Sequence, residues 1–185
     1  MPIRDNFVPG NILITGHPGV GKTTLVKQVI EQLRLDPVGF YTEEIREEGK
    51  RVGFRIKSLT PGLPRMEGVL ARIGLDGPYH RGPYTINIRD MEDVGARALE
   101  EALSHRTLIV IDEIGNMEIV SQRFQAAVIA SLESPRPVLG VIKYEPGPFV
   151  DRIRSRPDVE IIKLTRKHYK EVKSFVVKKV KQLII

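Results

Sequence analysis

The sequence predicts an α/β fold in which a mostly parallel sheet lies between two layers of helices. Short apolar runs rich in β-branched residues, which are typical of buried strands, alternate with helical patterns along the chain. Strands that are buried on both faces and separated by helices form parallel sheets with right-handed crossovers. The predicted strands cover residues 12–15, 38–42, 107–111, 138–142 and 159–164.

Three helices are predicted where apolar residues recur at spacings of three and four. They cover residues 22–33, 91–103 and 124–132, and Asp90 and Ser121 are the expected N-caps of the second and third. A fourth helical pattern, at residues 168–184, is strongly basic. Its apolar face is formed by Tyr169, Val172, Val176, Val180 and Leu183.

Residues 44–88 interrupt this alternation of strands and helices. Two short segments of alternating apolar residues, around Phe54 and Ile86, lie among many glycines and prolines. We interpret this region as an antiparallel β insertion beside the parallel sheet. Since no internal repeat or low-complexity tract is visible, we predict a single domain over residues 1–185.

The composition limits the classes of protein to which the chain can belong. It has 185 residues, 41% of them hydrophobic, which is enough for a continuous core and argues against disorder. Cysteine is absent, which excludes disulfides and thiolate metal sites. The first apolar run, at residues 12–14, is too short for a signal peptide, and no stretch approaches a membrane span. We therefore expect a cytoplasmic protein without a membrane partner.

The net charge of +6 is distributed unevenly along the chain. Residues 161–185 contain eight basic residues and one acid, a net charge of +7, so residues 1–160 sum to −1. Lysines on the polar face of a terminal helix are solvated and suit the C-terminal end of the helix dipole. We therefore interpret the excess as one solvated helix face and do not expect a nucleic-acid partner.

A glycine-rich segment follows the first predicted strand and leads directly into the first helix. It satisfies the pattern G-x-x-x-x-G-K-[ST], whose backbone N–H groups surround phosphates at a helix N-terminus. Lys22 is placed to reach the β- and γ-phosphates, and the Thr23 hydroxyl to ligate Mg²⁺. The segment consists of Gly16, His17, Pro18, Gly19, Val20, Gly21, Lys22, Thr23 and Thr24.

Two acidic residues, Asp112 and Glu113, end the third strand. Because ligands gather at the carboxyl ends of parallel strands, both carboxylates are expected to face the phosphate loop. Asp112 suits a metal-holding role with Thr23, and Glu113 suits a general base that orients the attacking water. The D-x-x-G pattern of switch GTPases is also satisfied here, but the N-K-x-D motif that reads guanine is absent from the chain.

These motifs resemble a known family, the cancer-related nucleoside triphosphatases, which are small RecA-like P-loop NTPases found from hyperthermophiles to animals. The resemblance covers residues 12–164. Besides the phosphate loop it rests on three stretches with specific residues. They are Gly39-Phe40-Tyr41-Thr42-Glu43-Glu44, Val110-Ile111-Asp112-Glu113-Ile114-Gly115-Asn116-Met117-Glu118 and Ile153-Arg154-Ser155-Arg156-Pro157-Asp158-Val159.

The resemblance implies a three-layer P-loop fold and a slow, Mg²⁺-dependent hydrolase of ATP, GTP and other nucleoside triphosphates with little base selectivity. It also implies that a second nucleotide-contacting stretch follows the loop. Two departures from the family are visible: Asn116 replaces a frequent lysine, and residues 165–169 lack the usual Thr-x-x-Asn-Arg. The implied second stretch consists of Leu108, Ile109, Val110, Ile111, Asp112, Glu113, Ile114 and Gly115.

Several other charged residues have weaker claims to a role. Glu43 ends the second predicted strand and is either near the metal or an ordinary exposed charge. Lys143 follows the fourth strand and is either near the γ-phosphate or solvated. Among Arg152, Arg154 and Arg156, the last is the first choice for an arginine finger in cis.

Three functions remain open at this stage. The first is a monomeric Mg²⁺-dependent nucleoside triphosphatase in which Lys22 and Glu113 are catalytic. The second is a P-loop kinase of a nucleoside or other small acceptor, with the arginines of the β insertion in a lid. The third is an ATPase that nucleic acid stimulates.

Overall fold

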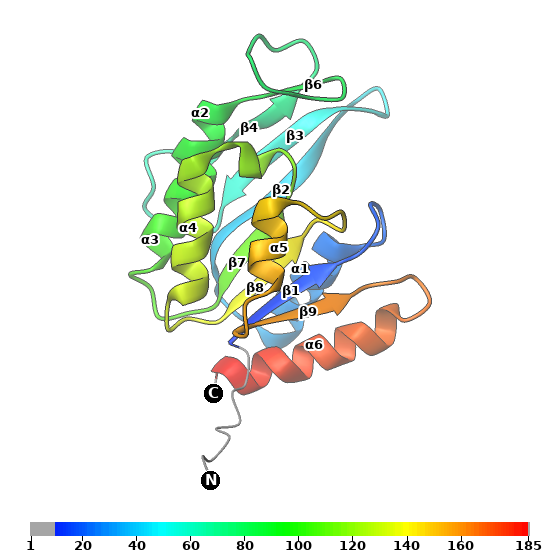
Figure 1. Ribbon diagram of the computed structural model, residues 1–185, viewed down its shortest axis with the longest axis vertical. Helices are drawn as coiled ribbons and strands as arrows, with labels where there is room; N and C mark the ends of the chain where they lie inside the picture. The colour runs from blue at the N-terminus through cyan, green and yellow to red at the C-terminus, as the bar shows by residue number, and fades with distance from the viewer. Residues whose placement is uncertain (1–9, 185) are drawn as a thin grey trace.

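The computed structural model describes residues 10–184 and shows a nine-stranded sheet with helices on both faces (Figure 1). The strand order is β5-β6-β4-β3-β2-β7-β8-β1-β9. This arrangement confirms the predicted α/β class with a mostly parallel core and an antiparallel insertion. The prediction that the chain has no leader concerns residues 1–9, which lie outside the described range.

The parallel half of the sheet contains every predicted strand. Hydrogen bonding joins β2 to β7, β7 to β8, β8 to β1 and β1 to β9, all in parallel. The second strand is longer than predicted, because it continues past Thr42 as the partner of β3. The bounds are β1 Asn11–Thr15, β2 Val38–Glu47, β7 Ile109–Ile114, β8 Val138–Ile142 and β9 Val159–Lys163.

The insertion extends the same sheet with antiparallel strands. β2 and β3 form a hairpin that rises past the carboxyl end of β7, and β4, β6 and β5 follow outward. The insertion is therefore continuous with the parallel sheet through β2. The bounds are β3 Lys50–Ser58, β4 Glu67–Arg72, β5 His80–Arg81 and β6 Tyr84–Ile86.

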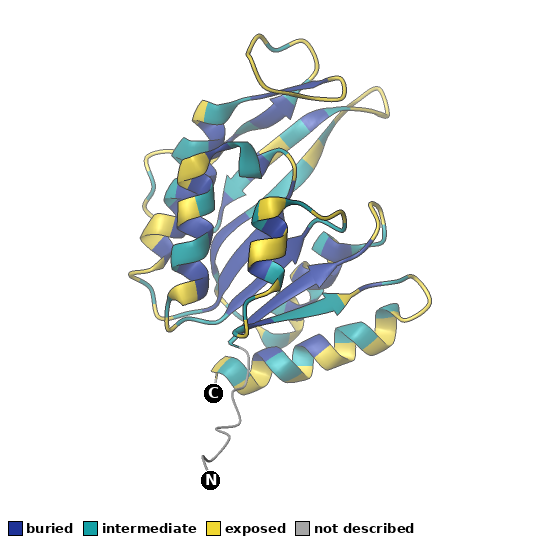
Figure 2. Cartoon of the chain, in the orientation of Figure 1, coloured by how far each residue is buried: buried dark blue, intermediate teal, exposed yellow. Residues whose placement is uncertain are grey.

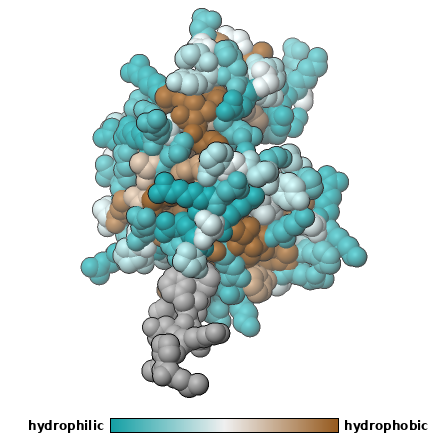
Figure 3. All heavy atoms as spheres, viewed as in Figure 1, coloured by the Kyte–Doolittle hydropathy of each residue, from teal (hydrophilic) through white to brown (hydrophobic). Residues whose placement is uncertain are grey.

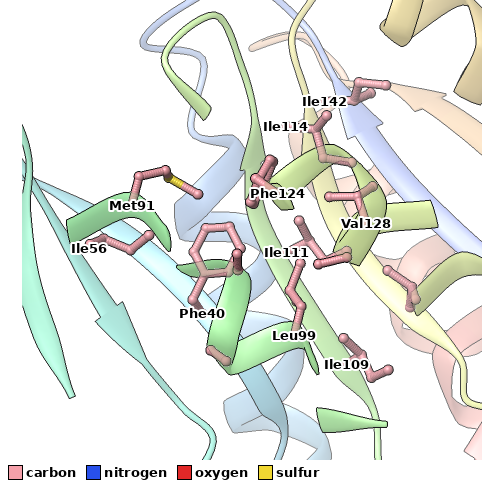
Figure 4. Packing of buried hydrophobic residues seen from close by; sticks show 14 of the residues in the cluster. Phe40, Ile56, Met91, Leu99, Ile109, Ile111, Ile114, Phe124, Val128 and Ile142 are labelled. Atoms are coloured by element: carbon pink, nitrogen blue, oxygen red, sulfur yellow. The ribbon is translucent and has the colours of Figure 1, made fainter. Parts of the chain in front are cut away.

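One face of the sheet is covered by the helices seen in front of it in Figure 1. Phe40 of β2 and Phe124 of α4 meet edge to face, with ring centroids 5.7 Å apart. Figure 4 shows these side chains converging with Met91, Leu99 and Ile111. The segments on this face are α2 Ile88–Asp90, the π-helical η1 Met91–Ala96, α3 Arg97–Ala102, the 3-10 helix η2 Glu118–Val120, α4 Gln122–Glu133 and α5 Pro148–Arg154.

The opposite face packs against α1 (Lys22–Leu33) and α6 (Tyr169–Ile184). Ile12 and Ile14 face these helices while Leu13 faces the other layer, as the period of a strand requires. The predicted apolar stripe of α6 packs on α1 and the sheet, and Val176 and Val180 are fully buried. Figure 2 shows buried strands between helices whose outer sides are exposed.

The start of the helical segment after β6 differs from the prediction. Asn87, not Asp90, is the N-cap, since its side chain accepts a hydrogen bond from the Asp90 backbone N–H at 3.1 Å. Asp90 is instead buried and binds Arg65 and the backbone N–H of Val69. The predicted cap Ser121 is confirmed, because its Oγ accepts from the Phe124 backbone N–H at 3.1 Å.

The exposed surface is mainly polar. Figure 3 shows hydrophilic residues over most of one face, with hydrophobic residues in separate patches. Between residues 10 and 184, no helix combines the length and the hydropathy needed to cross a membrane.

Candidate active site

A cavity of about 640 Å³ lies at the carboxyl ends of the parallel strands. The phosphate loop forms one wall, the residues after Asp112 form the second, and the β2–β3 hairpin forms the third. This is the edge at which open α/β sheets bind their ligands. The loop residues that line it are Pro18, Gly19, Gly21, Lys22, Thr23 and Thr24.

The phosphate loop has a conformation that depends on glycine. Gly21 precedes α1 with φ of 100°, and a Cβ there would lie 3.1 Å from the ring of Tyr169. At Gly16, a Cβ would lie 2.5 Å from the carbonyl oxygen of Leu164. No side chain caps the N-terminus of α1. Its first backbone N–H groups therefore remain available to an anion, which the helix dipole also favours.

Lys22 lies within the curve of the loop. Its Nζ donates hydrogen bonds to the carbonyl oxygens of Gly16 at 2.9 Å and His17 at 3.4 Å. The side chain is 9% exposed, so most of its length is packed inside the protein. These bonds hold the ammonium group within the loop, which is the position expected for contact with a phosphate.

Thr23 and Asp112 form the link between the loop and β7. The Thr23 hydroxyl donates to Oδ1 of Asp112 at 3.1 Å. Asp112 is 1% exposed, and its other oxygen, Oδ2, has no hydrogen-bond partner among the described residues. A buried carboxylate oxygen without a partner is costly unless a cation or proton satisfies it. A hydroxyl and a carboxylate are the hard oxygen ligands that Mg²⁺ prefers, so these residues fit a magnesium ion.

The pKa of Asp112 reflects the burial of its carboxylate. The pKa of Asp112 is raised to about 7, mainly by burial; the Thr23 hydrogen bond lowers it and the charge of Glu113 contributes to the increase. A divalent cation beside the carboxylate would reverse this trend, because it stabilises the ionised form.

Glu113 faces the cavity one residue further along. The pairing of β7 with β8 is irregular between Ile111 and Ile114, and in this stretch Glu113 lines the cavity while Asp112 is bonded to Thr23. Burial raises the pKa of Glu113, while the positive charges of Lys22 and Lys143 lower it. A partly desolvated carboxylate with a raised pKa suits a group that accepts a proton from water.

The rest of the predicted second stretch does not line the cavity. The residues that precede Asp112, together with Ile114, are buried in the two hydrophobic clusters. Of this stretch, only Glu113 and Gly115 line the cavity, and Asp112 is reached through its bond to Thr23. The buried residues are Leu108, Ile109, Val110, Ile111 and Ile114.

Three residues of the predicted loop also lie outside the cavity lining: Gly16, His17 and Val20. The ring of His17 packs on Tyr144 with centroids 4.5 Å apart. Gly16 and Val20 instead lie against each other within the loop, since a Cβ on Gly16 would lie 3.2 Å from the Val20 side chain.

Glu118 is a site residue to which the sequence analysis gives no role. It is 5% exposed, lines the cavity and lies close to Glu113 across Gly115, whose missing Cβ leaves room for both carboxyl groups. The pKa of Glu118 is raised to about 8, mainly by burial and in part by the charge of Glu113. Its place in the Asp-Glu-Ile-Gly-x-Met-Glu motif is the signal that could have identified it.

Lys143 and Asn116 are brought together at the rim. The Lys143 Nζ donates to Oδ1 of Asn116 at 2.9 Å. Asn116 stands where the family often has a lysine, so its own side chain carries no positive charge. The structure shows a lysine from the end of β8 bound to that side chain, so a positive charge is present there.

Glu43 lies in the middle of β2 and not at its end, contrary to the prediction. Its carboxylate forms ion pairs of 3.1 Å with Lys27 of α1 and with Lys57 of β3. Lys27 also lies over the ring of Tyr41, 4.1 Å from its centroid. Glu43 therefore ties the hairpin to the helix that follows the phosphate loop.

The prediction that Arg156 is an arginine finger is wrong. Arg156 precedes β9, whose first residue pairs with the first residue of β1, so it lies at the end of the sheet opposite the cavity. Its guanidinium pairs with Asp158 at 2.7 Å and with Glu133 at 3.4 Å.

Arg154 does lie at the carboxyl ends of the strands. Its Nη2 donates to the carbonyl oxygens of Lys143 at 2.6 Å and Tyr144 at 3.0 Å, and to the Thr15 hydroxyl at 3.3 Å. Thr15 is the last residue of β1. Arg154 thus fixes the ends of β1 and β8 beneath the phosphate loop.

The chain is similar to known proteins over most of its length. A protein-family model described as NTPase matches residues 11–177. A relative from Thermotoga sp. (strain RQ2), named nucleoside-triphosphatase THEP1, is 47% identical over 157 residues, which cover 85% of this chain and 87% of that protein.

Two solved structures share the fold. The crystal structure of THEP1 from the hyperthermophile Aquifex aeolicus superposes with a TM-score of 0.80 at 33% identity, covering 92% of this chain and 99% of that one. The solution structure of a human cancer-related nucleoside triphosphatase gives a TM-score of 0.76 at 34% identity, covering 93% of this chain and 97% of the human one.

Proposed function

Because the chain belongs to the NTPase family, we propose that it is a Mg²⁺-dependent nucleoside triphosphatase. It cleaves ATP, GTP and other nucleoside triphosphates into the diphosphate and inorganic phosphate. The observation that carries the proposal is the cavity lined by the phosphate loop and Glu113, with Asp112 buried beside it and bonded to Thr23. The printed names of the relatives, which are nucleoside-triphosphatases, support it.

Thr23 and Asp112 would hold the magnesium ion. When bound, Mg²⁺ neutralises charge on the β- and γ-phosphate oxygens. The partnerless Oδ2 of Asp112 and the Thr23 hydroxyl supply oxygen ligands from α1 and β7. Their fixed relative position means that little reorganisation is needed for binding.

Hydrolysis requires a water molecule aligned with the γ-phosphorus and the bridging oxygen. The Glu113 carboxylate accepts a hydrogen bond from this water and takes its proton as the new O–P bond forms. Lys22 and the backbone N–H groups of the loop stabilise the charge on the phosphate oxygens in the transition state. The bond between the bridging oxygen and the γ-phosphorus breaks, which releases the diphosphate.

Broad base tolerance follows from the groups that recognise the substrate. The loop N–H groups, Lys22 and the Thr23–Asp112 pair contact only the triphosphate and its metal, which all nucleoside triphosphates share. The chain contains no cysteine, which suits a reducing compartment. We further propose that the enzyme acts as a monomer in the cytoplasm without nucleic acid.

A phosphate-release assay tests the proposal. The four ribonucleoside triphosphates should be hydrolysed at similar rates with Mg²⁺, and EDTA should abolish release. Addition of RNA or DNA at low salt should leave the rate unchanged. A rate independent of Mg²⁺, or activity confined to one base, would contradict the corresponding part of the proposal.

A further inference from the structure

The cavity is larger than the phosphate site and extends along the β2–β3 hairpin. Its far part, which we term the hairpin lobe, combines an arginine, an acid, an aromatic ring and two aliphatic side chains. The residues of the hairpin lobe are Glu44, Arg51, Phe54, Leu70 and Met117. In the proposed function, the phosphate loop already binds the triphosphate. The Thr23–Asp112 pair holds its metal, and Glu113 accepts the proton from water.

Two irregularities in the sheet direct side chains into the hairpin lobe. In the pairing of β2 with β3, Val52 has no partner, so Arg51 and Phe54 come to lie on the same face although they are three residues apart. In the pairing of β3 with β4, Leu70 is the extra residue. Such bulges re-aim side chains and are frequent beside active sites.

The polar groups of the hairpin lobe are held in place before any ligand binds. Arg51 donates to Glu44 at 2.9 Å and to the Tyr84 hydroxyl at 3.0 Å. Its guanidinium lies over Phe54, 5.1 Å from the ring centroid, and Phe54 meets Tyr84 edge to face at 5.3 Å. Arg46 pairs with the second oxygen of Glu44.

The side of the cavity opposite the hairpin is tied to the insertion as well. Arg81 of β5 donates from Nε to the carbonyl oxygen of Asn116 at 3.2 Å. Asn116 and Met117 line the cavity directly after β7. Arg51 and Arg81 of the insertion are therefore held by fixed contacts, Arg51 in the cavity lining and Arg81 on the backbone of Asn116.

The mixture of a ring, a planar guanidinium, aliphatic groups and one carboxylate is the lining expected for an organic ligand. Phosphate oxygens would gain nothing from Phe54, Leu70 or Met117. A planar ring can pack on Phe54 and Arg51. The Glu44 carboxylate can accept a hydrogen bond from an N–H or O–H group of the same ligand.

We propose that the hairpin lobe binds a phosphoryl acceptor with a planar ring and a hydroxyl group, of which a nucleoside is the chemical type. This inference rests on the proposed function, because it uses the same phosphate site. The acceptor hydroxyl takes the place of the attacking water, and the enzyme divides its turnover between hydrolysis and transfer.

The transfer step balances without any further reagent. The hydroxyl oxygen of the acceptor forms a bond to the γ-phosphorus while the bond from that phosphorus to the bridging oxygen breaks. The hydroxyl proton passes to Glu113. The products are a nucleoside diphosphate and a phosphate monoester of the acceptor.

The test measures three products from one reaction of the full chain with labelled ATP, Mg²⁺ and a nucleoside at millimolar concentration. Adenosine, guanosine, cytidine, uridine and thymidine are tried in turn. Supporting results are a labelled nucleoside monophosphate and an excess of ADP over inorganic phosphate of the same amount. Equal amounts of ADP and phosphate with every nucleoside would overturn the inference and leave the proposed hydrolysis intact.

The same assay also shows whether the proposed hydrolysis fails. If ADP is formed only in the presence of a nucleoside, the inference is supported and the proposed hydrolysis is wrong. If no ADP is formed in any reaction, both are wrong.

Variants of the hairpin lobe identify the binding place. Phe54→Leu and Arg51→Met should each lower the ratio of transfer to hydrolysis roughly tenfold, the loss expected for one stacking contact. Arg55→Met is the matched control, because Arg55 lies on the other face of β3 and contacts Glu67 at 3.8 Å. An unchanged ratio in both lobe variants would overturn the assignment of the acceptor to the hairpin lobe.

A competing occupant of the hairpin lobe is the base of the nucleoside triphosphate itself. In that case Phe54→Leu would change the KM values for ATP and CTP by different factors and leave the ratio of transfer to hydrolysis as in the parent. That result would overturn the inference.

Discussion

The Thr23 hydroxyl lies 3.1 Å from Oδ1 of Asp112 and donates a hydrogen bond to it. The two residues are 89 positions apart in the chain, yet the bond joins the first turn of α1 to the second half of β7. It fixes the phosphate loop relative to Glu113, the next residue after Asp112. The distance between the groups that bind phosphate and the group that activates water is thereby set within the folded chain.

Replacement of Thr23 tests this relationship. Thr23→Val keeps the shape of the side chain but removes the hydroxyl, so the Mg²⁺ concentration required for half-maximal hydrolysis should rise at least about tenfold. Thr23→Ser restores the hydroxyl and should return the requirement close to that of the parent. A Mg²⁺ titration of phosphate release measures both. Equal Mg²⁺ requirements for the valine and serine variants would exclude Thr23 as a ligand.

Glu113→Gln should separate substrate binding from hydrolysis. The amide keeps the size of the side chain and a hydrogen-bond acceptor, but it cannot take a proton from water. The turnover rate should fall by about 10² to 10⁴ while the affinity for ATP stays within a few-fold. Single-turnover hydrolysis and equilibrium binding of a fluorescent nucleotide give the two quantities. Hydrolysis at the parental rate would show that another group is the base.

The site could be predicted wherever its chemistry is local in the sequence. The nine residues from Gly16 to Thr24 form one continuous loop segment, and strand and helix patterns flank them directly. Asp112 and Glu113 could be placed because parallel strands end at a common edge. The alternation of strands and helices predicted the fold class for the same reason.

The remaining features depend on contacts between distant segments. The polar residues Glu43 and Glu44 resemble a strand end in sequence, but β2 continues through them because β3 supplies backbone partners. The bulges at Val52 and Leu70 leave no mark on the pattern of apolar residues. Arg156 belongs to a family motif, yet sequence alone does not reveal at which end of the sheet that motif lies.

Glu118 should make the stability of the protein depend on pH. Its pKa is about 8 in the folded protein, above its ordinary value of 4.5, so between these values the folded state binds a proton that the unfolded state lacks. The free energy of unfolding should therefore fall as the pH rises from 4.5 to 8, by at most about 1.4 kcal/mol per unit from this group.

Glu118→Gln should remove this contribution. The variant should gain stability relative to the parent as the pH rises, since the amide stays neutral. Urea unfolding at pH 5, 6.5 and 8 in EDTA measures the difference, and Glu101→Gln on the exposed side of α3 is the matched control. A constant difference between Glu118→Gln and the parent across this range would show that Glu118 has the same pKa in both states.

Arg154 and Arg156 should differ in their effect on catalysis although they are two residues apart. Arg154→Met removes the donor that binds Thr15 and the carbonyl oxygens after β8, so the phosphate loop loses support and the KM for ATP should rise several-fold. Arg156→Gln removes surface ion pairs at the opposite end of the sheet and should lower stability by about 1 kcal/mol or less. Its kcat and KM should match those of the parent, because the residue is remote from the cavity. Steady-state kinetics with thermal unfolding of both variants provide the comparison. A loss of kcat of about 10³ in Arg156→Gln would restore that residue as an arginine finger.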